Sequence, residues 1–136
     1  MTLHGSRPAR AIALLLAMLA GGAFAENAKD VAQGALLPKD SVEASTFRGG
    51  LVFANYCVTC HGINADGNGR AARLYNPKPA NLRMSDKNDA YLSLIIRRGG
   101  AGMARSEFMP PWDAELTNEQ ISDLVSYLRS INASKN

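Results

Sequence analysis

Apolar residues recur at helical spacing directly before the only two cysteines of the chain. Between residues 47 and 57, the apolar side chains share one face of a helix. They are Leu51, Val52, Phe53 and Tyr56. This pattern predicts a first helix that packs on a partner through that face, and we expect ordered structure to begin near Thr46.

A second helix is predicted over Asp89–Arg98. Ser85 or Asp86 stands near its start as a capping side chain, and the pair Gly99-Gly100 can form a left-handed cap at its end. The residues between the first two helices, 63–80, contain several Gly and Pro residues and no long period. They are therefore expected to form a loop that follows the surface.

The last helix has the clearest pattern. Thr117 and Gln120 form a capping box at its start, and an apolar stripe follows. The stripe consists of Ile121, Leu124, Val125, Leu128 and Ile131, with Tyr127 beside it. No alternating strand pattern occurs, so three helices joined by irregular loops predict a small all-α domain.

The start of the chain has the pattern of an export signal. Arg7 and Arg10 precede an apolar run over 11–20, and Ala23-Phe24-Ala25 has the small-x-small pattern of a cleavage site. A retained membrane anchor is the alternative, but the run is shorter than the roughly 20 apolar residues that span a bilayer. We therefore expect an exported protein, periplasmic if bacterial, with no stable membrane span after cleavage.

This interpretation divides the chain into four parts. Residues 1–25 form the signal peptide, 26–45 an N-terminal arm, 46–131 the folded domain and 132–136 a C-terminal tail. Cleavage would remove two of the 15 Lys and Arg residues and none of the 12 acidic ones, so a net charge of +1 would remain. Because this charge is scattered, a nucleic-acid partner is not expected.

Candidate chemistry lies at the end of the first predicted helix. Cys57 and Cys60 are separated by two residues, and His61 follows at once, which is the Cys-x-x-Cys-His pattern of c-type haem attachment. Two thiols at this spacing can each add to one vinyl group of a haem, while the adjacent imidazole binds the iron. The pattern predicts one covalently bound haem c.

Three other roles are possible for these residues. A thioredoxin-like redox disulfide normally follows a strand, and none is predicted here. A structural zinc site needs four ligands, whereas only Cys57, Cys60 and His61 remain after signal cleavage, because His4 lies in the signal. A plain disulfide would close a strained short ring and leave His61 without a role.

A further motif, Met109-Pro110-Pro111-Trp112, lies between the second and last helices. Together with residues 53–62 and 121–129, it makes the chain resemble a class I c-type cytochrome over residues 46–131. The resemblance implies a cytochrome c-like fold of about three helices around one haem. It also implies thioether links at Cys57 and Cys60, His61 as the proximal iron ligand and Met109 as the sixth ligand.

The residues themselves also favour Met109 over Met84 and Met103 as that ligand. Met84 follows the loop closely, and Met103 lies in a flexible glycine-rich stretch. The two prolines after Met109 fix their own φ angles and bias Met109 toward an extended conformation, which would leave its sulfur little entropy to lose. Ordinary packing of Met109 in the pocket is the alternative.

The resemblance implies several supporting contacts. Gly49 and Phe53 would meet Leu124 and Tyr127, and a loop proline carbonyl would accept the second N–H of His61. Pro79 is favoured over Pro77 for that carbonyl, the alternative being that both only stiffen the loop.

Three further features each allow more than one role. Trp112 either donates to a haem propionate or fills the core. Arg97 and Arg98 either neutralise a propionate or complement a helix C-terminus. Residues 66–69 are expected to form a tight turn rather than a calcium site.

These expectations define a function. A haem iron with two protein ligands has no open site for substrate, which favours single-electron transfer at fairly high potential over enzyme catalysis. The partners would be a redox protein donor and acceptor in transient contact. The alternatives are a subunit held within an oxidase or dehydrogenase complex, and a haem enzyme or gas sensor whose methionine is displaced.

Overall fold

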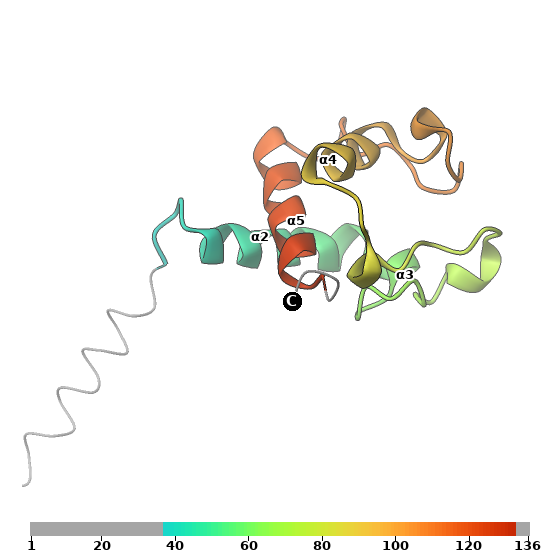
Figure 1. Cartoon of the computed structure of the whole chain (residues 1–136), viewed down its shortest axis with the longest axis horizontal. Helices are drawn as coiled ribbons and strands as arrows, with labels where there is room; N and C mark the ends of the chain where they lie inside the picture. The colour runs from blue at the N-terminus through green and yellow to red at the C-terminus, as the bar shows by residue number, and fades with distance from the viewer. Residues whose placement is uncertain (1–36, 133–136) are drawn as a thin grey trace, which may run out of the picture. The chain divides into compact units, whose positions relative to one another are not determined.

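A computed structural model describes residues 37–132, and their regular structure is entirely helical. The predicted all-α class is confirmed (Figure 1). The α-helices in this range are α2 (Val42–Tyr56), α3 (Val58–His61), α4 (Asp89–Arg98) and α5 (Asn118–Ser130), and the short 3₁₀ helices are η1 (Ala72–Leu74), η2 (Leu82–Met84) and η3 (Ala101–Met103). The signal peptide, the first part of the arm and residues 133–136 of the tail lie outside the described residues.

Helix α2 begins earlier than predicted. Its first residue is Val42, so the expectation of order from Thr46 was wrong for the last residues of the predicted arm. Ser41 is extended, and its side-chain oxygen accepts a hydrogen bond from the Ala44 N–H at 3.1 Å. This cap fixes the helix start although the apolar stripe begins only later.

The other two long helices follow the sequence pattern closely. α4 has the predicted bounds, but its capping residue is Asn88 rather than Ser85 or Asp86. Gly99 ends it with a φ of 68°. At α5 the predicted capping box is present, because the Thr117 hydroxyl accepts from the Gln120 N–H and the Gln120 side chain accepts from the Thr117 N–H.

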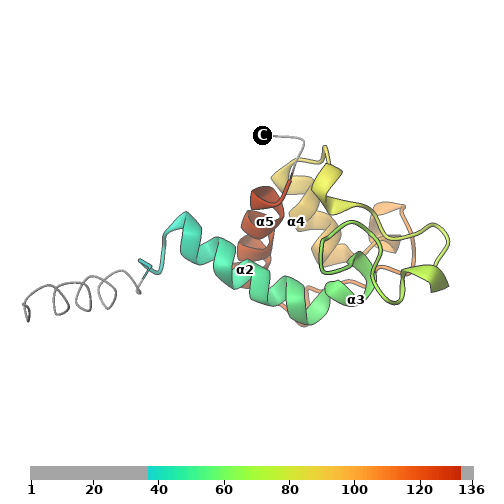
Figure 2. The same cartoon turned by 90° about the horizontal axis from the view of Figure 1, so that it is seen from below.

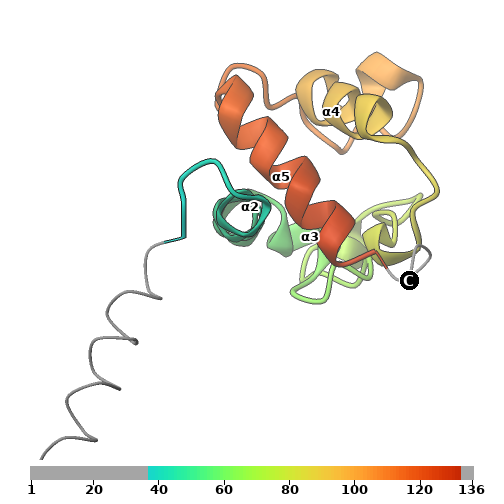
Figure 3. The same ribbon diagram turned by 60° about the vertical axis from the view of Figure 1, so that its left-hand side comes forward.

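Helices α2 and α5 cross in close contact (Figure 3). A Cβ atom on Gly49 would lie 1.9 Å from the carbonyl oxygen of Asp123, so only glycine permits this approach. The rings of Phe53 and Tyr127 meet across the crossing with centroids 5.2 Å apart. The predicted contact between the first and last helices is therefore confirmed.

An ionic network lies beside this apolar contact. The Arg48 guanidinium donates to both carboxylate oxygens of Asp123, at 2.7 and 3.0 Å, and the Ser45 hydroxyl donates to the same carboxylate at 2.7 Å. Asp123 is buried, and these donors hold its pKa below the usual value. The network therefore ties the first turns of α2 to α5.

The rest of the domain consists of α3, α4 and two long loops. The loop after α3 and the loop after α4 both lie beyond the end of α2 (Figure 2), and Figure 1 shows one above the other. The stacked rings of Tyr75 and Phe108, 4.9 Å apart, join these loops. Within residues 37–132 no helix is both long and apolar enough to cross a membrane.

Candidate functional site: a haem pocket

The turn of α3 brings the cysteine and histidine side chains to one wall of a cavity. Cys57 lies between α2 and α3, as the C-cap of the first helix and the N-cap of the second. The backbone N–H of His61 donates to the Cys57 carbonyl at 2.9 Å. Positions three and four residues apart lie on the same face of a helix. Cys57, Cys60 and His61 consequently all line the cavity.

The loop after His61 folds back over this turn. The Gly69 N–H donates to the Cys60 carbonyl at 3.1 Å, and the Ala71 N–H donates to the Thr59 carbonyl at 2.9 Å. A Cβ atom on Gly69 would lie 2.5 Å from three of these backbone atoms. The close approach of the loop, and with it the position of the cysteine wall, therefore requires glycine here.

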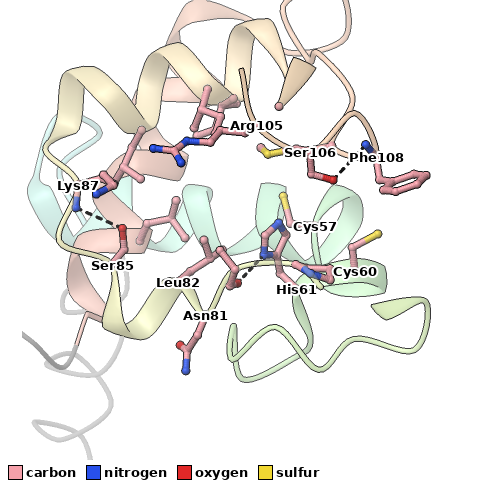
Figure 4. A pocket seen from close by; sticks show the side chains of 18 of the residues that line it. Cys57, Cys60, His61, Asn81, Leu82, Ser85, Lys87, Arg105, Ser106 and Phe108 are labelled. Carbon is pink, nitrogen blue, oxygen red and sulfur yellow. Dashed lines mark hydrogen bonds between the residues drawn. The ribbon is translucent and has the colours of Figure 1, made fainter. Parts of the chain in front are cut away.

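The His61 ring is held by a backbone carbonyl that meets its Nδ1 atom. Its Nδ1 lies 3.0 Å from the carbonyl oxygen of Ala80, so the ring N–H belongs on Nδ1 and Nε2 keeps its lone pair (Figure 4). Burial lowers the pKa of the imidazole, and the Ala80 carbonyl opposes that shift. The side chain is thus a neutral, oriented imidazole that could hold a metal ion through Nε2.

The acceptor differs from the predicted one by a single residue. Pro79 lines the cavity, but the carbonyl that meets His61 belongs to Ala80. The prediction of Pro79 was wrong because the identity of the carbonyl depends on how the loop turns between residues 77 and 82. The prolines in the sequence identify the loop that supplies the carbonyl acceptor of His61, but not the residue within that loop.

Met109 lies on the loop after α4 and also lines the cavity. Its carbonyl accepts a hydrogen bond from the Gly100 N–H at 2.8 Å, which closes the loop, and its side chain packs against the core. Met84 is largely exposed, and neither it nor Met103 lines the cavity. Of the methionines within residues 37–132, Met109 alone lines this cavity.

Trp112 forms part of the same wall. Its backbone N–H donates to the Ile96 carbonyl at 3.0 Å, and its ring meets that of Tyr56 edge-on, with centroids 5.3 Å apart. The partly buried side chain packs against the core. This packing agrees with the core-filling alternative, while donation to a propionate stays a prediction.

The remaining sequence candidates lie away from the cavity. The Arg97 guanidinium donates to the Asn118 side chain at 2.6 Å, and neither Arg97 nor Arg98 lines the cavity. In the 66–69 segment, the Asn68 N–H donates to the Asp66 carboxylate at 3.0 Å, as in a tight turn. Lys87, Tyr91 and Arg105 also line the cavity, but they lie outside any motif, so no sequence pattern marks them.

The cavity fits a haem in size and chemistry. Its volume of about 490 Å³ lies in the range of cofactor pockets, and most of its lining is apolar. Cys57 and Cys60 are both free thiols, and burial raises the pKa of Cys57 to about 12, with Cys60 adding to the shift. One wall thus presents two thiols and an imidazole, and a thioether sulfur comes from another segment.

A family model described as "Cytochrome c" matches residues 48–132. The chain belongs to the cytochrome c family. The family implies covalently bound haem with iron, which agrees with the two thiols and the imidazole on one wall of the cavity. The resemblance inferred from the three sequence blocks is confirmed, and a thioredoxin-like or zinc site is not supported.

Two known proteins are similar to this cytochrome c domain. The cbb3-type cytochrome c oxidase subunit FixP of Bradyrhizobium sp. (strain ORS 278) is 31% identical over 93 residues, which cover 64% of this chain and 28% of that protein. A chain of the reducing HAO-like protein complex of Kuenenia stuttgartiensis is 29% identical with a TM-score of 0.57, covering 74% of this chain and 46% of that one. The chain thus spans less than half of either relative.

Proposed function

We propose that this cytochrome c domain binds one haem through Cys57 and Cys60, with His61 and Met109 as its axial iron ligands, and transfers single electrons. The observation that carries the proposal is that all four side chains line one cavity. They come from two segments about fifty residues apart in the sequence, α3 and the loop after α4.

Each residue has a defined chemical task in this proposal. A cysteine thiol adds across a vinyl group, so that sulfur bonds to one vinyl carbon and the proton ends on the other, without any oxidant. His61 offers Nε2 to the iron because Nδ1 is committed to Ala80. When bound, the haem supplies reversible one-electron chemistry.

The ligand set favours electron transfer over catalysis. With His61 and Met109 both bound, no iron position is open to a substrate, so we propose that the domain is not an enzyme. Histidine and methionine together favour the reduced iron, and an apolar pocket disfavours the extra charge of the oxidised iron. A fairly high reduction potential follows.

The partners would be a donor and an acceptor protein that meet the domain at a small patch. A cytochrome subunit held within an oxidase or dehydrogenase complex is the second candidate. It is supported by the relatives, since FixP is an oxidase subunit and the Kuenenia chain belongs to a protein complex. Export, to the periplasm in a bacterium, is part of the proposal because covalent attachment suits a site where lost haem cannot be replaced.

Haem attachment is tested by mass spectrometry of the denatured protein. One haem mass should stay with the wild-type chain, whereas Cys57→Ala or Cys60→Ala should leave one thioether or prevent accumulation of the protein. Release of intact haem from the wild type by acid and organic solvent would contradict covalent attachment.

The sixth ligand is tested by the sulfur-to-iron charge-transfer band of the oxidised protein. Met109→Ala should abolish the band, lower the potential and open the iron to carbon monoxide or cyanide. Met103→Ala and Met84→Ala, whose side chains lie off the cavity, are the matched controls. Loss of the band in Met103→Ala instead, or its persistence in Met109→Ala, would overturn the assignment.

A further inference from the structure

The charged side chains of the cavity gather away from the cysteines. Figure 4 shows Lys87 and Arg105 on the opposite side of the cavity from the sulfur atoms of Cys57 and Cys60. Most of the wall between these ends is apolar. The cavity therefore has a thiol end and a cationic end.

Both cations at the cationic end contact the same side chain, that of Tyr91. The Arg105 guanidinium donates to the Tyr91 hydroxyl at 3.2 Å, and the Lys87 ammonium lies 5.9 Å from the centre of the Tyr91 ring. Tyr91 lies in the first turn of α4, so a regular element fixes the position of the pair.

Little negative charge faces these cations from the protein. The other ionisable groups on the cavity wall, apart from the cysteines and His61, are Tyr56, Tyr75, Lys78 and Asp86. Asp86, the one carboxylate that lines the cavity within residues 37–132, is largely exposed and pairs with Lys87 at 2.6 Å. Arg105 is exposed and has no carboxylate partner among the described ion pairs, so its guanidinium can donate to an anionic ligand.

Haem has the matching distribution of groups. Its vinyl groups lie on one edge of the ring and its two carboxylates on the opposite edge. If the vinyl groups meet Cys57 and Cys60, as the proposed function requires, the carboxylates point toward the cationic end. This inference therefore rests on the proposed function and adds to it the residues that meet the far edge.

Arg105 is also part of the loop that carries Met109. The backbone N–H of Arg105 donates to the Gly100 carbonyl at 2.8 Å, and the backbone N–H of Gly100 donates to the Met109 carbonyl at 2.8 Å. Both residues thus share Gly100 as their anchor. A group that holds the Arg105 side chain consequently restrains the backbone of the Met109 loop.

We propose that Arg105 and Lys87 form the carboxylate-binding end of the haem pocket, and that Arg105 is a positioning residue that keeps the Met109 loop closed over the iron. Loss of the Arg105 charge then has two separable consequences. The haem carboxylate loses a counter-charge, which favours the oxidised iron and lowers the potential. The Met109 loop opens more often, which exposes the iron to external ligands.

The test compares the holoprotein with its Arg105→Gln and Arg98→Gln variants. Arg98 also carries a cation at the end of α4, but it does not line the cavity. The readouts are the reduction potential, titrated between about pH 5 and pH 9, and the rate at which cyanide binds the oxidised protein.

Arg105→Gln should have a lower reduction potential than the wild type. The pH range over which the potential changes should also lie higher, because a haem carboxylate without a counter-charge binds a proton more readily. Cyanide should bind about tenfold faster, which corresponds to about 1.4 kcal/mol of lost loop closure. Arg98→Gln should match the wild type, and Arg105→Lys should restore much of the potential because it keeps the charge.

A wild-type potential and cyanide rate in Arg105→Gln would overturn the inference, as would equal changes in Arg98→Gln. If Arg105→Gln does not accumulate as holoprotein, Lys87→Gln and Tyr91→Phe decide, since each should lower the potential and wild-type values in both would overturn it. If the wild type carries covalent haem but the variants keep the wild-type potential and cyanide rate, only the inference about Arg105 and Lys87 is contradicted. A wild type without covalent haem would contradict the proposed function as well.

Discussion

Helices α2 and α5 cross through interlocking apolar and ionic side chains, whereas α3, α4 and two loops, which supply most of the cavity wall, are joined by isolated contacts. At the crossing, Phe53 and Leu124 are almost fully buried, and the backbone polar groups are satisfied within each helix. Such a contact draws its free energy from apolar burial within the chain itself.

The cavity walls are held differently. Single backbone hydrogen bonds connect distant positions, such as the one from the Leu82 N–H to the Ala65 carbonyl at 2.8 Å. Beyond these, the Tyr75 and Phe108 rings stack between the loops. The difference indicates that the crossing is the stable frame of the domain and that the loops depend more strongly on a bound group.

The largest expected effect comes from breaking the frame. Phe53→Ala removes a ring that is 2% exposed and should lower the free energy of unfolding by about 3 to 5 kcal/mol. Phe47→Ala on the same helix is the control, because that ring is 64% exposed and should cost about 0.5 kcal/mol or less. Denaturant unfolding of the holoprotein measures both, and equal costs would mean that the crossing is not the frame.

A smaller effect is expected from the ionic part of the crossing. Asp123→Asn replaces charge-assisted hydrogen bonds with weaker ones and should cost about 2 kcal/mol at pH 7. Because the folded pKa of Asp123 lies below its unfolded value, its stabilisation is present above the unfolded pKa of about 4 and is lost as the pH falls through the folded pKa.

The difference in unfolding free energy between wild type and Asp123→Asn should therefore shrink as the pH falls below about 4. Asp113→Asn, at an exposed carboxylate in the loop before α5, is the control and should stay within about 0.5 kcal/mol of the wild type. A difference for Asp123→Asn that does not change with pH would show that charge contributes nothing to the crossing.

The smallest effect should come from the loops. Phe108→Ala removes one ring of the stacked pair with Tyr75 and should cost about 1 kcal/mol in the same unfolding measurement. Leu74→Ala, next to Tyr75 and 71% exposed, should be nearly neutral. If Phe108→Ala lowered the free energy of unfolding as much as Phe53→Ala, the crossing of α2 and α5 would be no more important to stability than the loops.

The sequence by itself determined the helical frame and the chemistry of one cavity wall. The bounds of α4, the capping box of α5 and the contact of Phe53 with Tyr127 all follow from local patterns and from the family resemblance. The spacing of Cys57, Cys60 and His61 needs only helical geometry to place three side chains on one face. The helix bounds, the capping box and the cysteine spacing are readable because each depends on residues close together in the chain, whereas the contact of Phe53 with Tyr127 follows from the family resemblance.

The tertiary structure alone decided which groups the loops bring together. The choice of Ala80 over Pro79 as the partner of His61 depends on the path of a loop, and a shift of one residue leaves the composition of that loop unchanged. The meeting of Arg105 with Tyr91 likewise joins a loop to a helix without any sequence period. Loop paths follow from the sum of many weak contacts across the fold, so no local pattern in the sequence reports them.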